Sequence, residues 1–189
     1  MPELNERQGR SALLRALPSV VSLARIALLV PIWLAMLVPM QLGYATAFII
    51  YAIAALTDLF DGFLARRLGA VTNFGITLDT IADKVLVLGV LLNLALHQHL
   101  TELALAAFAV IAAREIIVTA LRLISYGHGL VIESSLLAKS KTVCQMSGVG
   151  ALLAVPFMPM LNDIGTWILA LAAALSVLSA IQYLRRRRT

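Results

Sequence analysis

The sequence feature that most constrains the fold is a succession of long apolar runs joined by short polar connections. We expect helices of membrane-spanning length at 19–40, 43–68, 73–96, 102–126, 135–158 and 164–183. About 20 apolar residues in a helix cross a bilayer, where a helix satisfies its own backbone polar groups. The composition agrees, because 61% of the residues are hydrophobic and the mean hydropathy is +0.93. The sequence predicts an all-α integral membrane protein with six transmembrane helices.

The remaining segments do not divide the chain, so we expect one domain over residues 1–189. Residues 1–17 mix charged side chains with leucines, which is typical of an amphipathic helix on the membrane surface; a solvated tail is the alternative. The six-helix bundle would cover 19–184, and a basic tail would follow at 185–189. The single cysteine, Cys144, excludes an intrachain disulfide.

Lys and Arg are distributed unevenly between the two ends of the expected spans. The connections near 39–43, 97–101 and 159–163 carry neither residue. The opposite ends carry Arg66, Arg67, Arg122, Lys139, Lys141 and 185–188. Cytoplasmic connections are enriched in Lys and Arg, so both termini should be cytoplasmic. The net charge of +5 then reflects orientation and contact with anionic lipids, and we do not expect a nucleic-acid partner.

Four aspartates lie at the end of the second apolar run and near the start of the third. Their three- and four-residue spacings place each pair on one helix face together with small residues. The first face holds Asp58, Asp61, Gly62 and Ala65, and the second holds Gly75, Asp79 and Asp83. An Asp at the bilayer centre costs about 2.5–3.5 kcal/mol, so these carboxylates need a wet or metal-filled cavity. Carboxylate ligands suit Mg²⁺ or Mn²⁺, and two such ions could accept a diphosphate.

The small residues on these faces have two interpretations. Gly62, Ala65 and Gly75 could let a neighbouring helix come close, or they could leave room for a ligand. Because they share faces with the aspartates, we favour the pocket.

The full pattern resembles the signature of the CDP-alcohol phosphatidyltransferase family. It reads Asp58-x₂-Asp61-Gly62-x₂-Ala65-Arg66-x₈-Gly75-x₃-Asp79-x₃-Asp83. The resemblance implies a six-span membrane enzyme, usually a homodimer, in which an alcohol attacks a CDP-linked lipid and CMP leaves. It also implies that all four aspartates hold two Mg²⁺ or Mn²⁺ ions, with Asp83 also acting as the catalytic base. The spacing alone does not identify the base.

The same resemblance implies a set of residues that bind the CDP-linked lipid. It covers Gly62, Ala65, Arg66 and Gly75, and it extends to residues 18–25, which resemble another family pattern. That segment contributes Ser22 and Arg25. Ser19 stands where the family usually has asparagine, so a contact made by that amide would be absent here.

Residues 114–145 resemble the branch of the family whose acceptor is glycerol 3-phosphate. The resemblance implies that the acceptor phosphate is bound by Arg114, Arg122, Lys139 and Lys141. Three of these could instead anchor helix ends at anionic headgroups, and Arg114 could pair with Glu115 as part of the structure. Lys139 and Lys141 lie about 200° apart around a helix, so we expect only one to reach the acceptor. The sequence does not decide which.

The resemblance implies transfer of a phosphatidyl group from CDP-diacylglycerol to glycerol 3-phosphate, which we expect at the cytoplasmic face of a bacterial inner membrane. Another acceptor, such as inositol phosphate, serine or phosphatidylglycerol, would keep the same chemistry. A divalent-cation transporter is the alternative from another class, with the aspartates as its transport site. The complete motif, its confinement to one membrane face and the expected lack of polar residues in the first and last runs argue against transport.

Overall fold

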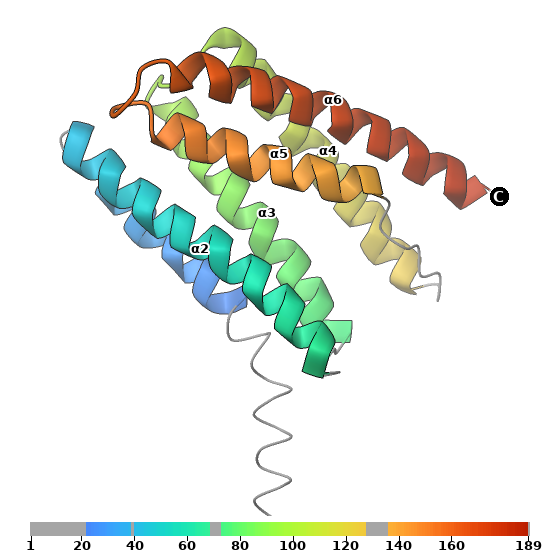
Figure 1. Ribbon diagram of the computed structural model, residues 1–189. Coiled ribbons are helices and arrows are strands. Elements are labelled where there is room, and N and C mark those ends of the chain that lie inside the picture. Colours follow the sequence, from blue (N-terminus) through green and yellow to red (C-terminus); the bar gives the residue numbers. More distant parts are fainter. Residues whose placement is uncertain (1–21, 39, 69–72, 128–135, 189) are drawn as a thin grey trace, which may run out of the picture. The chain divides into compact units, whose positions relative to one another are not determined.

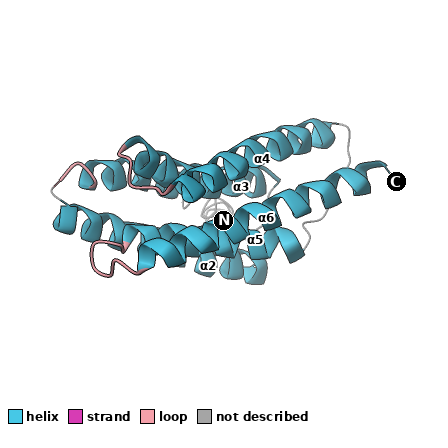
Figure 2. Ribbon diagram, turned by 90° about the horizontal axis from the view of Figure 1, so that it is seen from above, coloured by secondary structure: helices cyan, strands magenta, loops and turns pink. Residues whose placement is uncertain are grey.

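The computed structural model describes residues 22–38, 40–68, 73–127 and 136–188 (Figure 1). Within these ranges, the side chains at 40, 58–80, 83, 122–127, 136, 138–139 and 186–188 are not described. The described ranges contain helices and turns but no strand (Figure 2), which confirms the all-α prediction. The expected interfacial segment 1–17 lies outside the described residues.

Six helices account for nearly all of the described residues. They are Ser22–Ala35, α2 (Met40–Leu68), α3 (Asn73–Leu96), α4 (Glu102–Gly127), α5 (Leu136–Leu153) and α6 (Leu161–Arg188). Two segments of the described chain, Glu102–Leu121 and Leu161–Arg185, are long and apolar enough to cross a membrane. Ser22–Ala35, Gln41–Thr57 and Lys84–Leu96 are shorter apolar helices. Six transmembrane helices therefore remain a prediction.

Proline explains where two helices depart from the predicted bounds. The helix α5 ends at Leu153 rather than at 158, because Pro156 lacks a backbone N–H and disfavours helical geometry in the residue before it. The first helix ends at Ala35, and a turn follows in which the Val38 N–H donates to the Ala35 carbonyl at 3.0 Å. Pro39 comes directly after this turn in the sequence.

The chain forms two compact units, Met1–Gly89 and Val90–Thr189. The single domain predicted over 1–189 stays a prediction. In the first unit, the helix Ser22–Ala35 packs on α3 at Gly89. The Trp33 indole N–H donates to the Gly89 carbonyl at 3.0 Å, and a Cβ at position 89 would lie 2.6 Å from Leu29 Cδ2. Glycine therefore allows the first helix to touch the α3 backbone.

In the second unit, α6 packs against both α4 and α5 (Figure 1). The close approach of α5 and α6 depends on small residues, since the side chain of Leu169 lies 3.0 Å from where a Cβ on Gly148 would be. Near the start of α4 and α6, the hydroxyls of Thr101 and Thr166 are 3.1 Å apart and share a hydrogen bond. These contacts fix α6 between its two neighbours, which determines the polar contacts described next.

Candidate functional site

The aspartate motif occupies the end of α2 and the first half of α3. Asp58, Asp61, Gly62, Ala65 and Arg66 belong to α2. Gly75, Asp79 and Asp83 belong to α3. The prediction that two successive helices carry these residues is confirmed, whereas their side chains lie outside the described residues. Four carboxylate donors fit a hard divalent cation such as Mg²⁺ by their chemistry. Among the described side chains, no group of three His, Cys, Asp or Glu could hold a metal ion.

Ser22 and Arg25 lie in the first turn of the helix Ser22–Ala35. They are three residues apart, hence on one helix face, and both are buried, with exposed fractions of 1% and 2%. Burial of an arginine requires polar or charged partners nearby. Contact of these two residues with a CDP-linked lipid remains a prediction.

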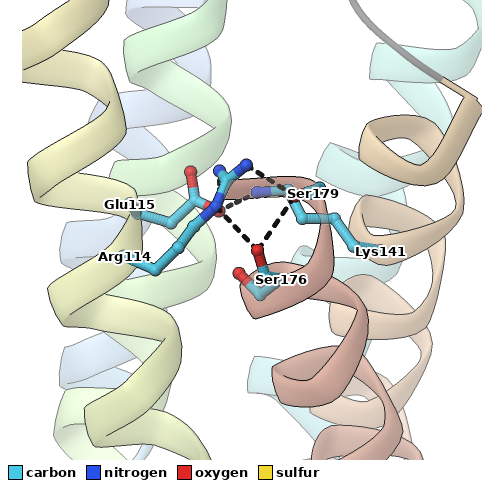
Figure 3. Close-up of polar contacts among 5 residues, drawn as sticks. All are labelled: Arg114, Glu115, Lys141, Ser176 and Ser179. Carbon is cyan, nitrogen blue, oxygen red and sulfur yellow. Dashed lines mark hydrogen bonds and ion pairs between the residues drawn. The ribbon is translucent and has the colours of Figure 1, made fainter. Parts of the chain in front are cut away.

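Five polar residues from three helices meet inside the second unit (Figure 3). We call them the charged cluster: Arg114 and Glu115 of α4, Lys141 of α5, and Ser176 and Ser179 of α6. Arg114 lies near the middle of α4, about 18 Å along the helix axis from Glu102 at 1.5 Å per residue. By the same rise it lies about 10 Å from Leu121, so the cluster is nearer to the C-terminal end of the membrane-length segment Glu102–Leu121.

Arg114 donates a hydrogen bond from each nitrogen of its guanidinium, and two of the three reach α6. Its Nε donates to the Ser176 carbonyl at 3.1 Å, and one terminal nitrogen donates to Ser179 Oγ at 2.6 Å. The other terminal nitrogen donates to Glu115 Oε1 at 3.1 Å. The Ser179 hydroxyl in turn donates to the Ser176 carbonyl at 2.9 Å, so it accepts from the arginine and donates to the backbone. The guanidinium is held in one orientation by these contacts.

Glu115 is shared by two cations. Its Oε1 accepts from Arg114 and also forms an ion pair with the Lys141 ammonium. Glu115 and Lys141 are only 3% and 5% exposed. Removing one partner from a buried ion pair typically costs about 3–5 kcal/mol, so this carboxylate and its cations depend on one another. Two positive side chains and one carboxylate leave the cluster with one net positive charge.

Two buried polar atoms on the helices that form the cluster lack a hydrogen-bond partner among the described residues, one on Gln145 and one on Ser176. Gln145 follows Lys141 by four residues, hence on the same face of α5, and it is 5% exposed. Its Nε2, like the Oγ of Ser176, has no hydrogen-bond partner among the described residues. Such a group costs roughly 1–3 kcal/mol when buried without a partner. The helices that form the charged cluster therefore carry two buried polar groups without a partner, besides the excess positive charge of the cluster.

The fold brings together two of the four residues predicted to bind an acceptor phosphate. Arg114 and Lys141 meet at Glu115, whereas the side chains of Arg122 and Lys139 lie outside the described residues. The alternative in which Arg114 pairs with Glu115 is confirmed as a contact. Whether the same arginine also binds an acceptor remains a prediction.

Sequence reasoning missed the contribution of α6. The expected lack of polar residues in the last apolar run was wrong, because Thr166, Ser176 and Ser179 are buried on α6. Ser176 and Ser179 are three residues apart and therefore share a helix face. That spacing was the available signal, but small hydroxyl residues also occur often at helix contacts within membranes.

The described part of the chain is all-helical, carries an acidic motif on two successive helices and buries a cationic cluster. Its sequence shows the family to which it belongs. Residues 15–178 match the sequence model of the CDP-alcohol phosphatidyltransferases, and the chain belongs to that family.

Several bacterial relatives are named CDP-diacylglycerol--glycerol-3-phosphate 3-phosphatidyltransferase. The chain is 38% identical to the one from Pectobacterium atrosepticum, 37% to that from Sodalis glossinidius and 36% to that from Escherichia coli strain K12. Each similarity extends over 174 residues, which are 91% of this chain and 94% of the relative. The two membrane-length helices and these relatives indicate a bacterial-type membrane protein.

Proposed function

We propose that the protein transfers a phosphatidyl group from CDP-diacylglycerol to glycerol 3-phosphate, which yields phosphatidylglycerophosphate and CMP. The observation that carries the proposal is the near-full-length similarity to relatives named for this reaction. The charged cluster supplies a chemical reason, since its net positive charge suits a phosphorylated acceptor better than serine.

The aspartate motif would serve the nucleotide end of the reaction. Members of this family are in general dependent on a divalent metal, and Asp58, Asp61, Asp79 and Asp83 are the carboxylates that would hold it. Bound Mg²⁺ would supply positive charge that stabilises the diphosphate while CMP leaves. Gly62, Ala65 and Gly75 leave room for the cytidine diphosphate, while Arg66, Ser22 and Arg25 contact it.

The chain's own residues carry the proton and orient the acceptor. Asp83 accepts the proton of the acceptor hydroxyl while the hydroxyl oxygen forms a bond to the lipid-side phosphorus. The bond between that phosphorus and the bridging oxygen breaks, and CMP departs with the bridging oxygen. The acceptor phosphate is held by cations drawn from Arg114, Arg122, Lys139 and Lys141.

The same proposal includes the arrangement in the membrane. Six helices span a bacterial inner membrane with both termini and the aspartate motif on the cytoplasmic side, where glycerol 3-phosphate and CMP are soluble. The basic tail 185–189 contacts anionic lipid, and two copies of the chain form a homodimer.

Release of CMP tests the reaction and the acceptor together. Purified protein in detergent is given CDP-diacylglycerol and Mg²⁺ with glycerol 3-phosphate, inositol phosphate, serine or no acceptor. We expect release only with glycerol 3-phosphate, loss of release on chelation and recovery when Mg²⁺ is restored. Release with inositol phosphate or serine alone would contradict the acceptor, and no release from folded protein with any acceptor would contradict the reaction.

Replacement of one aspartate tests the metal site. Asp61→Asn keeps the size of the side chain but removes a charge, so we expect turnover to fall by more than about 100-fold while the protein stays folded. The matched control is Asp163→Asn, because Asp163 is exposed in the first turn of α6. Normal turnover in Asp61→Asn would disprove its role as a ligand.

A further inference from the structure

Glu115 belongs neither to the aspartate motif nor to the four cationic residues predicted to bind the acceptor, so its role is not yet assigned. It sits between the guanidinium of Arg114 and the ammonium of Lys141, from two different helices, and the three side chains are between 3% and 10% exposed. A buried carboxylate needs charged or hydrogen-bonding partners, and Glu115 has two cations in contact. Because both cations contact the same carboxylate oxygen, Glu115 keeps Arg114 of α4 close to Lys141 of α5.

Neutralising Glu115 would remove a contact from each of the two cations. Arg114 would keep its two α6 acceptors, the Ser176 carbonyl and Ser179 Oγ, if Glu115 were neutralised. Lys141 would lose its ion pair with Glu115. An ammonium on a four-carbon chain has many rotamers, and the ion pair with Glu115 restricts them.

The surroundings of the cluster fit an anion with several oxygens. Two cations that share one carboxylate leave one net positive charge. Gln145 Nε2 and Ser176 Oγ add buried groups without a hydrogen-bond partner among the described residues. An ammonium carries three N–H donors and a guanidinium five, so pairing with Glu115 does not prevent either from donating to a phosphate.

We propose that Glu115 is a positioning residue of the acceptor-phosphate site. Through its contacts with Lys141 and Arg114, it holds both cations where the phosphate of the acceptor binds. This inference rests on the proposed function and adds a residue to it. Glu115 does not touch the acceptor, and it acts by placing the cations. The phosphate offsets the excess positive charge that Glu115 leaves.

Charge and position predict opposite effects when Glu115 is neutralised. Glu115→Gln raises the net charge of the cluster from +1 to +2, which by itself would strengthen phosphate binding and lower the KM for glycerol 3-phosphate. Misplacement of Lys141 would instead raise the KM for glycerol 3-phosphate. We expect a rise of about 10- to 100-fold, with the KM for CDP-diacylglycerol within about twofold of wild type, because misplacing one substrate by about an ångström has effects of this size.

Three further variants separate positioning from folding. Glu115→Asp keeps the charge on a shorter side chain and should restore part of the acceptor KM. The double variant Glu115→Gln with Lys141→Met removes both members of one ion pair, while Arg114 keeps its contacts with α6. We therefore expect a smaller loss of thermal stability than in Glu115→Gln, with the KM still raised. Glu102→Gln is the matched control, because Glu102 is exposed at the start of the same helix.

Several results would overturn the inference. They are a lowered or unchanged acceptor KM in Glu115→Gln, an equal rise for both substrates, or a wild-type acceptor KM in the double variant. If Glu115→Gln does not fold, the double variant and Glu115→Asp decide alone.

A binding measurement distinguishes failure of the inference about Glu115 from failure of the proposed function. Wild-type protein that releases no CMP with glycerol 3-phosphate would refute the function. Independently, glycerol 3-phosphate alone should raise the melting temperature of wild type and Glu102→Gln but not that of the double variant. An equal rise in the double variant would refute the role of Glu115, whatever the reaction.

Discussion

Gly43, near the start of α2, has less room for a side chain than the other glycines whose surroundings are described. A Cβ there would lie 2.3 Å from the Ala35 carbonyl oxygen and 2.7 Å from that of Val38. Both are backbone atoms of the preceding helix end and turn, so neither can move by a rotamer change. We expect Gly43→Ala to destabilise the protein by about 1–3 kcal/mol, measured by thermal or denaturant unfolding in detergent.

Gly148→Ala is the matched control for this substitution. The nearest atoms to a Cβ at position 148 belong to the Leu169 side chain, at 3.0 Å, and a leucine side chain can shift. Alanine also favours a helix over glycine by up to about 1 kcal/mol, so the control should change little. Equal stability of the two variants would contradict the account of Gly43.

The residues of the charged cluster show what a sequence alone can and cannot predict. The position of Arg114 within an apolar run and its possible pairing with Glu115 follow from the sequence, because adjacent charges in an apolar segment need partners. The choice between Lys139 and Lys141 does not, since apolar side chains surround α5 almost evenly and leave its rotation undetermined. The structure places Lys141 on Glu115, 26 positions earlier in the chain, which is a tertiary contact.

The C-terminus of α3 ends in a Schellman motif whose left-handed residue is not glycine. The N–H of His99 donates to the Leu94 carbonyl at 2.9 Å and that of Gln98 to Ala95 at 3.1 Å. Gln98 has a φ of 56° and an exposed side chain. Glycine adopts this conformation without steric cost, although it loses more entropy on folding, so Gln98→Gly should stabilise the protein by about 0.5–1 kcal/mol net.

Two variants at the same position check this expectation. Gln98→Ala keeps the Cβ and should match wild type, while the β-branched Gln98→Val should lower the melting temperature. A melting temperature for Gln98→Gly at or below that of Gln98→Ala would show that the backbone conformation is not strained.

The helix α4 begins with a side-chain cap that also contacts α6. Thr101 Oγ1 accepts from the Ala104 N–H at 3.2 Å and shares a hydrogen bond with the buried Thr166 hydroxyl at 3.1 Å. Thr101→Ala removes both interactions, and we expect a loss of about 1–2 kcal/mol of unfolding free energy in detergent. Thr101→Ser retains the oxygen and should lie within about 0.5 kcal/mol of wild type. Similar losses in both variants would point to the missing methyl group instead.

The agreement of the helices with the predicted runs has a physical limit. The run 73–96 has the same bounds as α3, because polar residues and turns stop both the apolar pattern and the helix. The last run ends at 183 by apolarity, whereas α6 continues to Arg188, since arginine is a good helix former outside the membrane as well. Apolar patterns therefore predict what is buried or in lipid, and helix ends depend on backbone chemistry.

For the whole molecule, the distribution of Lys and Arg predicts one orientation, and the single cysteine makes it testable. In a Cys144→Ser background, cysteines introduced singly at the exposed residues His99 and Met160 mark two connections that carry no Lys or Arg. A cysteine added after Thr189 marks the basic tail. Because basic segments stay on the cytoplasmic side, a membrane-impermeant maleimide should label positions 99 and 160 in spheroplasts with an intact inner membrane.

The tail cysteine should react only after that membrane is permeabilised. Cys144 itself is half-buried within α5, so the unmodified chain should react poorly in intact spheroplasts and serves as the background control. Labelling of only one of positions 99 and 160 would mean an odd number of crossings between them. That result would contradict the prediction that both α4 and α5 cross the membrane between these two turns. Labelling of the tail alone would reverse the predicted orientation.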